Sequence, residues 1–381
     1  MLWTILVVLA TVLVAYSNGA NDNFKGVATL FGSGATDYKR ALNWATLTTF
    51  AGSVTAVFFA TKLIKTFSGK GLVPDALIAN PAFLTAVIFG AGLTVLLASK
   101  IGVPISTTHS LTGALMGSGI AAIGLQLNTG ALWNSFFMPL ILSPFIATLL
   151  ATFIYPLLRF ITRTSGIRKS TCICIGERII PVGTVALTHG QMLSAAELRA
   201  LDVIVDEKEN CCAKAIQTYS GKLVGIDAQK MVDALHYLSA GALSFARGLN
   251  DTPKIVALSL ALGTLGLKFN IWLVALAMAL GGVIGARHVA ETMSHRITQM
   301  SHGQGFTSNL IASFLVIFAS HLGFPVSTTH VSCGSLFGIG LVNGKAYWKV
   351  IGGIISAWIL TLPIAAVLSG GLFIILNGIK S

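Results

Sequence analysis

The sequence predicts an all-α polytopic membrane protein whose two related halves are joined by a small soluble insert. Of its 381 residues, 54% are apolar and 10% are charged, whereas roughly a quarter of the residues of a soluble domain carry charge. Several runs contain the ~20 apolar residues that cross a bilayer. Two polar blocks occur twice, in the same order, within this apolar sequence. The first two observations indicate a membrane protein, and the third indicates a duplication.

The long apolar runs are the candidate membrane segments. They are residues 1–16, 41–61, 81–99, 131–155, 271–285, 311–320 with its flanks, and 351–376. The first run is as long as a signal peptide, but it has no basic start and no clear small-residue cleavage site. We therefore expect it to be retained as a membrane helix.

The formal net charge of +12 would suggest nucleic-acid binding in a soluble protein. Here the basic residues are spread through the loops that flank the apolar runs. In that position they set the orientation of the chain and contact lipid head groups. We expect a multi-pass protein of the cytoplasmic (plasma) membrane, in contact with the lipid bilayer and without a nucleic-acid partner.

The duplication is read from two pairs of polar blocks. Residues 19–25 and 248–254 read GANDNFK and GLNDTPK, and residues 104–109 and 325–330 read PISTTH and PVSTTH. The distance from Asn21 to Ser106 is 85 positions, and that from Asn250 to Ser327 is 77. We expect the Asn-Asp blocks to break helices over 17–23 and 247–253, and each Ser-Thr-Thr block to begin a helix after a Pro-containing break.

A hydrophilic stretch separates the two copies. The sequence predicts a first membrane repeat over 1–162, a linker domain over 163–233 and a second membrane repeat over 234–381. The linker has β-favouring stretches at 171–175, 202–205 and 222–226 beside a helical one at 195–201, so it is expected to be a small α+β insert. A basic cluster near its start places it in the cytoplasm by the positive-inside rule. An odd number of crossings in the first repeat would make the two repeats inverted.

Two carboxylates lie within apolar sequence, Asp22 and Asp251. A carboxylate at membrane depth costs at least ~2.5–3.5 kcal/mol, so it needs a partner. We interpret both as groups that bind Na⁺ or accept H⁺, with the amide oxygens of Asn21 and Asn250 as further ligands. The alternative is that each aspartate only caps the following half-helix. Lys25 and Lys254, three positions further on, would pair with the aspartates or attract anions, and the sequence does not rank these roles.

The Ser-Thr-Thr blocks predict an anion site. The first N–H groups of a helix, its dipole and several hydroxyls together suit a small oxyanion. The candidate phosphate-binding residues are Ser106, Thr107, Thr108, Ser327, Thr328 and Thr329. Ordinary N-capping is the alternative for a single copy. A bound cation beside Asp22 and Asp251 would favour the anion and so couple the two.

The remaining reactive residues give weaker predictions. His109 and His330 close the Ser-Thr-Thr blocks, but they do not have the helical spacing of a base for the serine, so hydrogen bonding to neighbouring helices is favoured over a protonation role. A lone nucleophile or metal cluster is missing from the pattern, so no catalytic residue is assigned. Four cysteines of the linker lack the usual zinc spacing and give only a weak zinc prediction. They are Cys172, Cys174, Cys211 and Cys212.

At the Asn-Asp and Ser-Thr-Thr blocks the chain resembles the PiT family of inorganic phosphate transporters, which has two copies of each signature in this order. The resemblance covers both membrane repeats, and Leu249 replaces the alanine of the second signature. It implies inverted repeats with 10–12 membrane segments including re-entrant ones, outside termini and a homodimer. It also implies that Asn21, Asp22, Asn250 and Asp251 serve the cation, and that the Ser-Thr-Thr hydroxyls hold phosphate with Asp22 and Asp251 at its edge.

The function expected from the residues and the resemblance together is secondary active symport of inorganic phosphate by alternating access. Co-transported Na⁺ is the favoured coupling ion, and no other cofactor is expected. An H⁺-coupled phosphate carrier or a sulfate permease is the alternative within the same class. A membrane phosphohydrolase and a passive anion channel are the alternatives from other classes, and the duplication of every polar element argues against the hydrolase.

Overall fold

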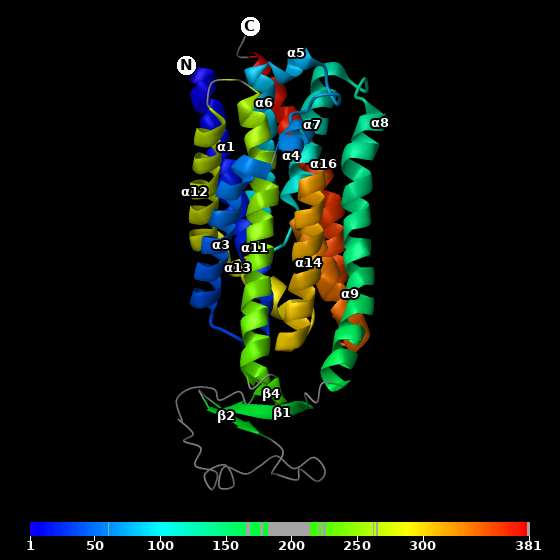
Figure 1. Ribbon diagram of the computed structural model, residues 1–381. Helices are drawn as coiled ribbons and strands as arrows, with labels where there is room; N and C mark the ends of the chain where they lie inside the picture. The colour runs from blue at the N-terminus through cyan, green and yellow to red at the C-terminus, as the bar shows by residue number, and fades with distance from the viewer. Residues whose placement is uncertain are drawn as a thin grey trace.

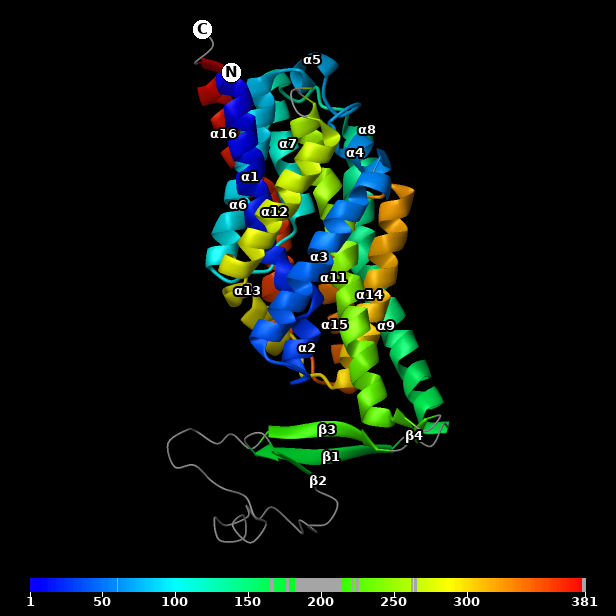
Figure 2. The ribbon, with the colours of Figure 1, turned by 60° about the vertical axis from the view of Figure 1, so that its left-hand side comes forward.

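The computed structural model describes residues 1–59, 61–164, 168–175, 178–181, 214–220, 222–223, 226–261, 263 and 266–378. The helices form an elongated bundle, and a small sheet lies beyond one end of it (Figure 1). Helix α1 begins and helix α16 ends at the opposite end of the bundle (Figures 1 and 2). The predicted all-α polytopic class is confirmed.

The N-terminal half of the bundle extends from α1 to α9. Its elements are α1 (Leu2–Asp22), the 3₁₀ turn η1 (Asn23–Gly26), α2 (Ala28–Gly32), α3 (Tyr38–Phe59), α4 (Thr61–Phe67), α5 (Asp75–Ile78), α6 (Pro81–Lys100), α7 (Thr107–Ile123), α8 (Thr129–Leu132), the π-helical turn η2 (Trp133–Phe137) and α9 (Met138–Thr164). The C-terminal half extends from α11 to α16. Its elements are α11 (Ala228–Leu260), α12 (Leu267–Gly285), α13 (Arg287–Glu291), the π-helical turn η4 (Thr292–Arg296), α14 (His302–Leu322), α15 (Thr328–Asn343) and α16 (Trp348–Gly378).

Within the described residues, 6 helical stretches are long and apolar enough to cross a membrane. They are Leu2–Gly26, Pro81–Lys100, Thr129–Ile161, Leu267–Gly285, His302–Leu322 and Trp348–Gly378. The bent pair α3 and α4 raises the number to 7. Helices α7 and α15 have 17 and 16 residues, so they are too short to cross alone. The family resemblance implies 10–12 membrane segments. That number is reached only if shorter helices such as α7 and α15, which are too short to cross the membrane alone, are counted as segments.

The structure corrects both interruptions predicted for the Asn-Asp helices. Helix α1 continues through Asp22, and the break falls later, in the 3₁₀ turn Asn23–Gly26. Helix α11 is continuous through the second Asn-Asp block, although Pro253 lies inside it. A proline removes one helical hydrogen bond, but residues 246–259 are all buried. Packing of that segment maintains the helix against its local preference.

Helices of each half of the bundle pack against helices of the other half. Helix α1 packs against α6 and against α12 of the other half, and α11 packs against α14 and against α3. In the same way α7 packs on α16, and α15 packs on α9. The motif glycines permit two of these contacts. A Cβ added at Gly19 would lie 2.0 Å from the Met278 carbonyl oxygen on α12, and one at Gly248 would lie 2.1 Å from the Thr49 carbonyl oxygen on α3.

The described part of the linker forms short antiparallel strands. They are β1 (Arg168–Ile175), β2 (Arg178–Pro181), β3 (Lys214–Ser220), β4 (Lys222–Leu223) and β5 (Ile226–Asp227). The first three form one sheet in the order β2-β1-β3, with Cys172 opposite both Pro181 and Ile216. The predictions at 171–175 and 222–226 coincide with β1 and with β4 and β5. Those at 195–201 and 202–205 lie outside the described residues.

Candidate functional site

The first Asn-Asp pair lies at the C-terminal end of α1, where the helix gives way to the 3₁₀ turn. The Asp22 carboxylate is buried, and its Oδ1 is 2.5 Å from Nζ of Lys25. The Asn21 side chain bridges to the segment before α7. Its amide nitrogen donates to Ser99 Oγ at 3.1 Å, and its Oδ1 accepts from the backbone N–H of Ile105 at 3.1 Å. Asn21 and Asp22 therefore join the end of α1 to the beginning of the Ser-Thr-Thr block.

The second Asn-Asp pair lies in the C-terminal third of α11. Asp251 Oδ1 is 3.3 Å from Nζ of Lys254 and accepts from the Asn250 amide nitrogen at 3.1 Å. The same amide donates to the Val326 carbonyl oxygen at 3.2 Å, and Asn250 Oδ1 accepts from Ser320 Oγ at 3.0 Å. The second pair is thus joined to the segment before α15, as the first is to the segment before α7.

One asparagine connects the two carboxylates. The amide nitrogen of Asn18 lies 3.1 Å from Asp22 Oδ2, 3.3 Å from Asp251 Oδ2 and 2.9 Å from Thr107 Oγ1. The two acidic groups, 229 positions apart in the chain, therefore belong to a single site. The sequence prediction that they act together has this geometry in its favour.

The Ser-Thr-Thr residues divide between capping and site contacts. Ser106 Oγ accepts from the His109 N–H, and Ser327 Oγ accepts from the His330 N–H, so both serines are N-caps. The threonines extend the site. Thr107 Oγ1 is 3.3 Å from Asp22, Thr108 Oγ1 is 2.9 Å from Lys254 Nζ, and Thr329 Oγ1 is 2.6 Å from Lys25 Nζ. Thr328 is buried in the same turn and has no side-chain hydrogen bond to the others among the described residues.

Arg247 is the main site residue that sequence reasoning did not assign. It precedes the second Gly-x-Asn-Asp block at the position that Asn18 occupies in the first. Its side chain is 1% exposed, and its Nη2 is 3.5 Å from Asn18 Oδ1. Within the described residues its Nε and Nη1 have no hydrogen-bond partner. The available signal was a charged residue among apolar ones, directly beside a motif.

The charges of this cluster favour an anion. Two carboxylates lie beside three basic groups, Lys25, Lys254 and Arg247, all of them buried. With every group ionised, the described cluster has one more positive than negative charge. The N-termini of α7 and α15 also point into the site, and the free N–H groups of a helix N-terminus favour negative charge.

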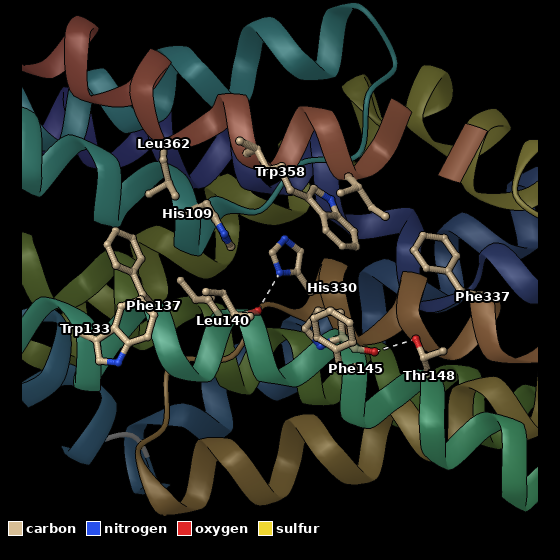
Figure 3. Close-up of a pocket in the computed structure, with 14 residues that line it drawn as sticks. His109, Trp133, Phe137, Leu140, Phe145, Thr148, His330, Phe337, Trp358 and Leu362 are labelled. Carbon is tan, nitrogen blue, oxygen red and sulfur yellow. Dashed lines mark hydrogen bonds between the residues drawn. The ribbon is translucent and has the colours of Figure 1, made fainter. Parts of the chain in front are cut away.

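The two histidines lie beside this cluster and line a separate cavity. The ring centroids of His109 and His330 are 4.4 Å apart, and the His330 Nδ1 lies 3.3 Å from the Leu140 carbonyl oxygen. The cavity, about 510 Å³, is otherwise mainly apolar, with Trp358 and Phe137 among its walls (Figure 3). The expected hydrogen bond to a neighbouring helix is present for His330. The structure gives none for the His109 Nδ1 among the described residues.

The weak zinc prediction cannot be placed on the described part of the chain. Cys211 and Cys212 lie outside the described residues, and Cys172 and Cys174 are described only as members of β1. Elsewhere, the described residues contain no group of three or more His, Cys, Asp or Glu side chains that could hold a metal ion. The fifth cysteine, Cys333, is a free, buried thiol.

A buried site to which two halves of a helical membrane protein contribute charged and hydroxyl groups is typical of polytopic transporters for small charged solutes. The profile of the phosphate transporter family matches residues 18–369. The chain belongs to this family, and it is a transporter rather than an enzyme.

Named relatives support the family membership over the whole length. A protein named as a phosphate permease of Pyrococcus abyssi is 29% identical over 401 residues, with 98% of each chain covered. One named as a low-affinity inorganic phosphate transporter of Bacillus subtilis is 26% identical, with 98% of this chain and 97% of the relative covered. A solved structure titled as the sodium-dependent phosphate transporter has the same fold, with a TM-score of 0.75, 22% identity and full coverage of both chains.

Proposed function

We propose that this protein carries inorganic phosphate across the cytoplasmic membrane in symport with a monovalent cation, by alternating access between its two halves. The observation that carries the proposal is that neither half holds a complete site. The Thr329 hydroxyl of the C-terminal half contacts Lys25, and the Thr108 hydroxyl of the N-terminal half contacts Lys254. A solute bound there contacts both halves, so its binding affects their relative position.

Phosphate would be held by Arg247 and by the threonine hydroxyls, of which those of Thr107, Thr108 and Thr329 would have to turn from their present partners toward the anion. A guanidinium presents paired N–H donors that match two phosphate oxygens, and the Nε and Nη1 of Arg247 have no protein partner among the described residues. Thr107, Thr108, Thr328 and Thr329 lie in the first turns of α7 and α15, where free backbone N–H groups favour an anion. Ser106 and Ser327 contribute as N-caps of these turns.

The cation would be held at the two Asn-Asp pairs. Asn21, Asp22, Asn250 and Asp251 offer the amide and carboxylate oxygens that suit Na⁺, and the solved structural neighbour is titled as sodium-dependent. A proton is the alternative, because carboxylates and lysine side chains both exchange protons. The lysine contacts of these same oxygens bear directly on the choice between Na⁺ and H⁺.

Alternating access is supported by the opposite directions of α1 and α11. Helix α1 starts at the end of the bundle far from the sheet, and α11 starts beside the sheet (Figure 1). The two Asn-Asp helices therefore cross the site in opposite senses, which is the arrangement of inverted-repeat transporters. On this proposal the linker is cytoplasmic and the termini are outside, and the protein acts as a homodimer.

The test is uptake of ³²P-phosphate into proteoliposomes with an imposed inward Na⁺ or H⁺ gradient. We expect accumulation above that of protein-free liposomes, with greater competition by arsenate than by sulfate. Arsenate has the same charge and nearly the same geometry as phosphate. No gradient-driven accumulation with either ion would contradict symport, and stronger competition by sulfate would contradict the assignment of phosphate.

A further inference from the structure

Lys25 places its ammonium group inside a cage of oxygens at the first Asn-Asp pair. The side chain is 2% exposed. Its Nζ lies 2.5 Å from Asp22 Oδ1, 2.8 Å from Asn21 Oδ1, 2.8 Å from the Ile105 carbonyl oxygen and 2.6 Å from Thr329 Oγ1. Carboxylate, amide, carbonyl and hydroxyl oxygens are the ligands expected for a bound Na⁺ at this pair. Here a protein cation already holds them.

The oxygens around Lys25 suit an ammonium ion, because they are arranged to accept. The Asn21 and Ile105 oxygens can only accept. The Thr329 hydroxyl donates to the Ile105 carbonyl oxygen at 2.8 Å, so its oxygen is left to accept from the lysine. With the Asp22 carboxylate they make four acceptor oxygens, and the three N–H donors of an ammonium satisfy more of them than the two of a neutral amine.

Lys254 repeats the arrangement in the other half. Its Nζ is 2.7 Å from the Val326 carbonyl oxygen, 2.9 Å from Thr108 Oγ1 and 3.3 Å from Asp251 Oδ1. Thr108 lies 3.5 Å from the Val326 carbonyl oxygen, as Thr329 lies near that of Ile105. The equivalent atoms of the duplicated motifs thus form the second cage, although Asn250 Oδ1 is bonded to Ser320 instead.

We propose that Lys25 and Lys254 are tethered cations that take the place of Na⁺ at the two Asn-Asp cages, so that phosphate binds to this protein without Na⁺. A metal ion and an ammonium cannot share these oxygens, because they would overlap and repel each other. With Arg247, the two lysines already give the cluster an excess positive charge over Asp22 and Asp251. The anion therefore has its electrostatic partner before any metal ion binds.

This inference rests on the proposed function and, of the two coupling ions considered there, removes Na⁺ from the Asn-Asp pairs and leaves the proton. The test is equilibrium binding of ³³P-phosphate to the purified protein in nanodiscs, with NaCl replaced by choline chloride at constant pH and ionic strength. We expect the phosphate Kd to change by less than about twofold. Weakening of about tenfold or more without Na⁺ would overturn the inference while leaving phosphate transport intact. No phosphate binding in either salt would contradict the proposed function itself.

Variants at Lys25 sharpen the test. Lys25→Ala empties the cage and leaves its oxygens, so phosphate binding should fall about tenfold or more in choline chloride and recover with Na⁺ or ammonium. Lys25→Met fills the same space without charge, so neither ion should restore binding. Lys268→Ala removes an exposed lysine of α12 and should behave as the wild type. Equal phosphate binding by all variants in choline chloride would overturn the inference. If Lys25→Ala is unstable, the wild-type Kd values in NaCl and in choline chloride are sufficient to test it.

Discussion

The two Asn-Asp pairs present the same side chains on different backbones. At the first pair, α1 ends at Asp22 and a 3₁₀ turn follows. At the second pair, α11 continues for nine residues beyond Asp251, from Thr252 to Leu260. The first lysine lies within 2.8 Å of four oxygens, whereas the second has contacts of 2.7–3.3 Å with three. The interrupted helix brings its lysine deeper into the cage.

This difference leads us to expect separate tasks for the two Asn-Asp pairs. A helix end can move without disturbing a hydrogen-bonded backbone, since the groups after it are already free of the helical pattern. A continuous helix transmits displacement along its length. We therefore expect the first pair to hold its lysine more tightly and the second pair to move with α11 as one body.

The largest expected effects follow from neutralising the aspartate of either Asn-Asp pair. Asp22→Asn and Asp251→Asn each leave a buried ammonium without its counter-charge, which costs about 3–5 kcal/mol in comparable buried pairs. We expect gradient-driven phosphate uptake to be abolished in both, with the greater loss of thermal stability for Asp22→Asn. Asp37→Asn, at an exposed pair with Arg40, is the control and should transport normally. Unchanged uptake in both site variants would contradict the mechanism.

The next largest effect is expected at Arg247, which precedes the motif glycine Gly248 as Asn18 precedes Gly19. Arg247→Asn places the residue of the first copy in the second. We expect phosphate affinity to fall by the value of charged hydrogen bonds, about 1.5–3 kcal/mol, and Arg247→Lys to recover only part of it because a lysine lacks the paired donors. Phosphate binding in nanodiscs measures both. Affinity equal to wild type in Arg247→Asn would remove this residue from the site.

The motif glycines test whether the helix contacts of the two halves are equally close. Gly19→Ala and Gly248→Ala push a methyl group against a backbone oxygen of α12 or α3, at a cost of about 1–3 kcal/mol. Thermal unfolding in detergent should show a similar loss for both. Gly352→Ala in α16 has no atom within 4 Å of the added methyl and should be neutral or stabilising. Loss in only one motif variant would show that the packing is not duplicated.

The smallest effect is expected at the helix caps, where the two halves are alike. Ser106→Ala and Ser327→Ala each remove one N-cap hydrogen bond, worth about 0.5–2 kcal/mol. We expect equal decreases in thermal stability, because the cap distances are 3.1 and 3.2 Å. A decrease well beyond this range in one variant would indicate a further role for that serine.

Much of this arrangement could be predicted from the sequence, because the duplication carried the information. A recurring Asn-Asp and Ser-Thr-Thr order indicates equivalent positions, and Gly-x-Pro breaks predict where α7 and α15 begin. The continuity of α11 could not be predicted, since Pro253 favours a break locally and only the packing of buried neighbours opposes it. The oxygen contacts of Lys25 and Lys254 could not be predicted from the sequence either, for a different reason. Lys25 and Thr329 are 304 positions apart, and no periodicity links a side chain to an oxygen in the other half.

The packing of helices from one half against helices of the other has a consequence for the order in which the protein folds. Helix α7 packs mainly on α16, which lies far later in the chain, while α15 packs on α9. Such contacts between distant segments form late, because a long loop must close before they add stability. We therefore expect α7 to be covered mainly by α6 until α16 is in place. A chain truncated before α16 would lack the main surface against which α7 packs.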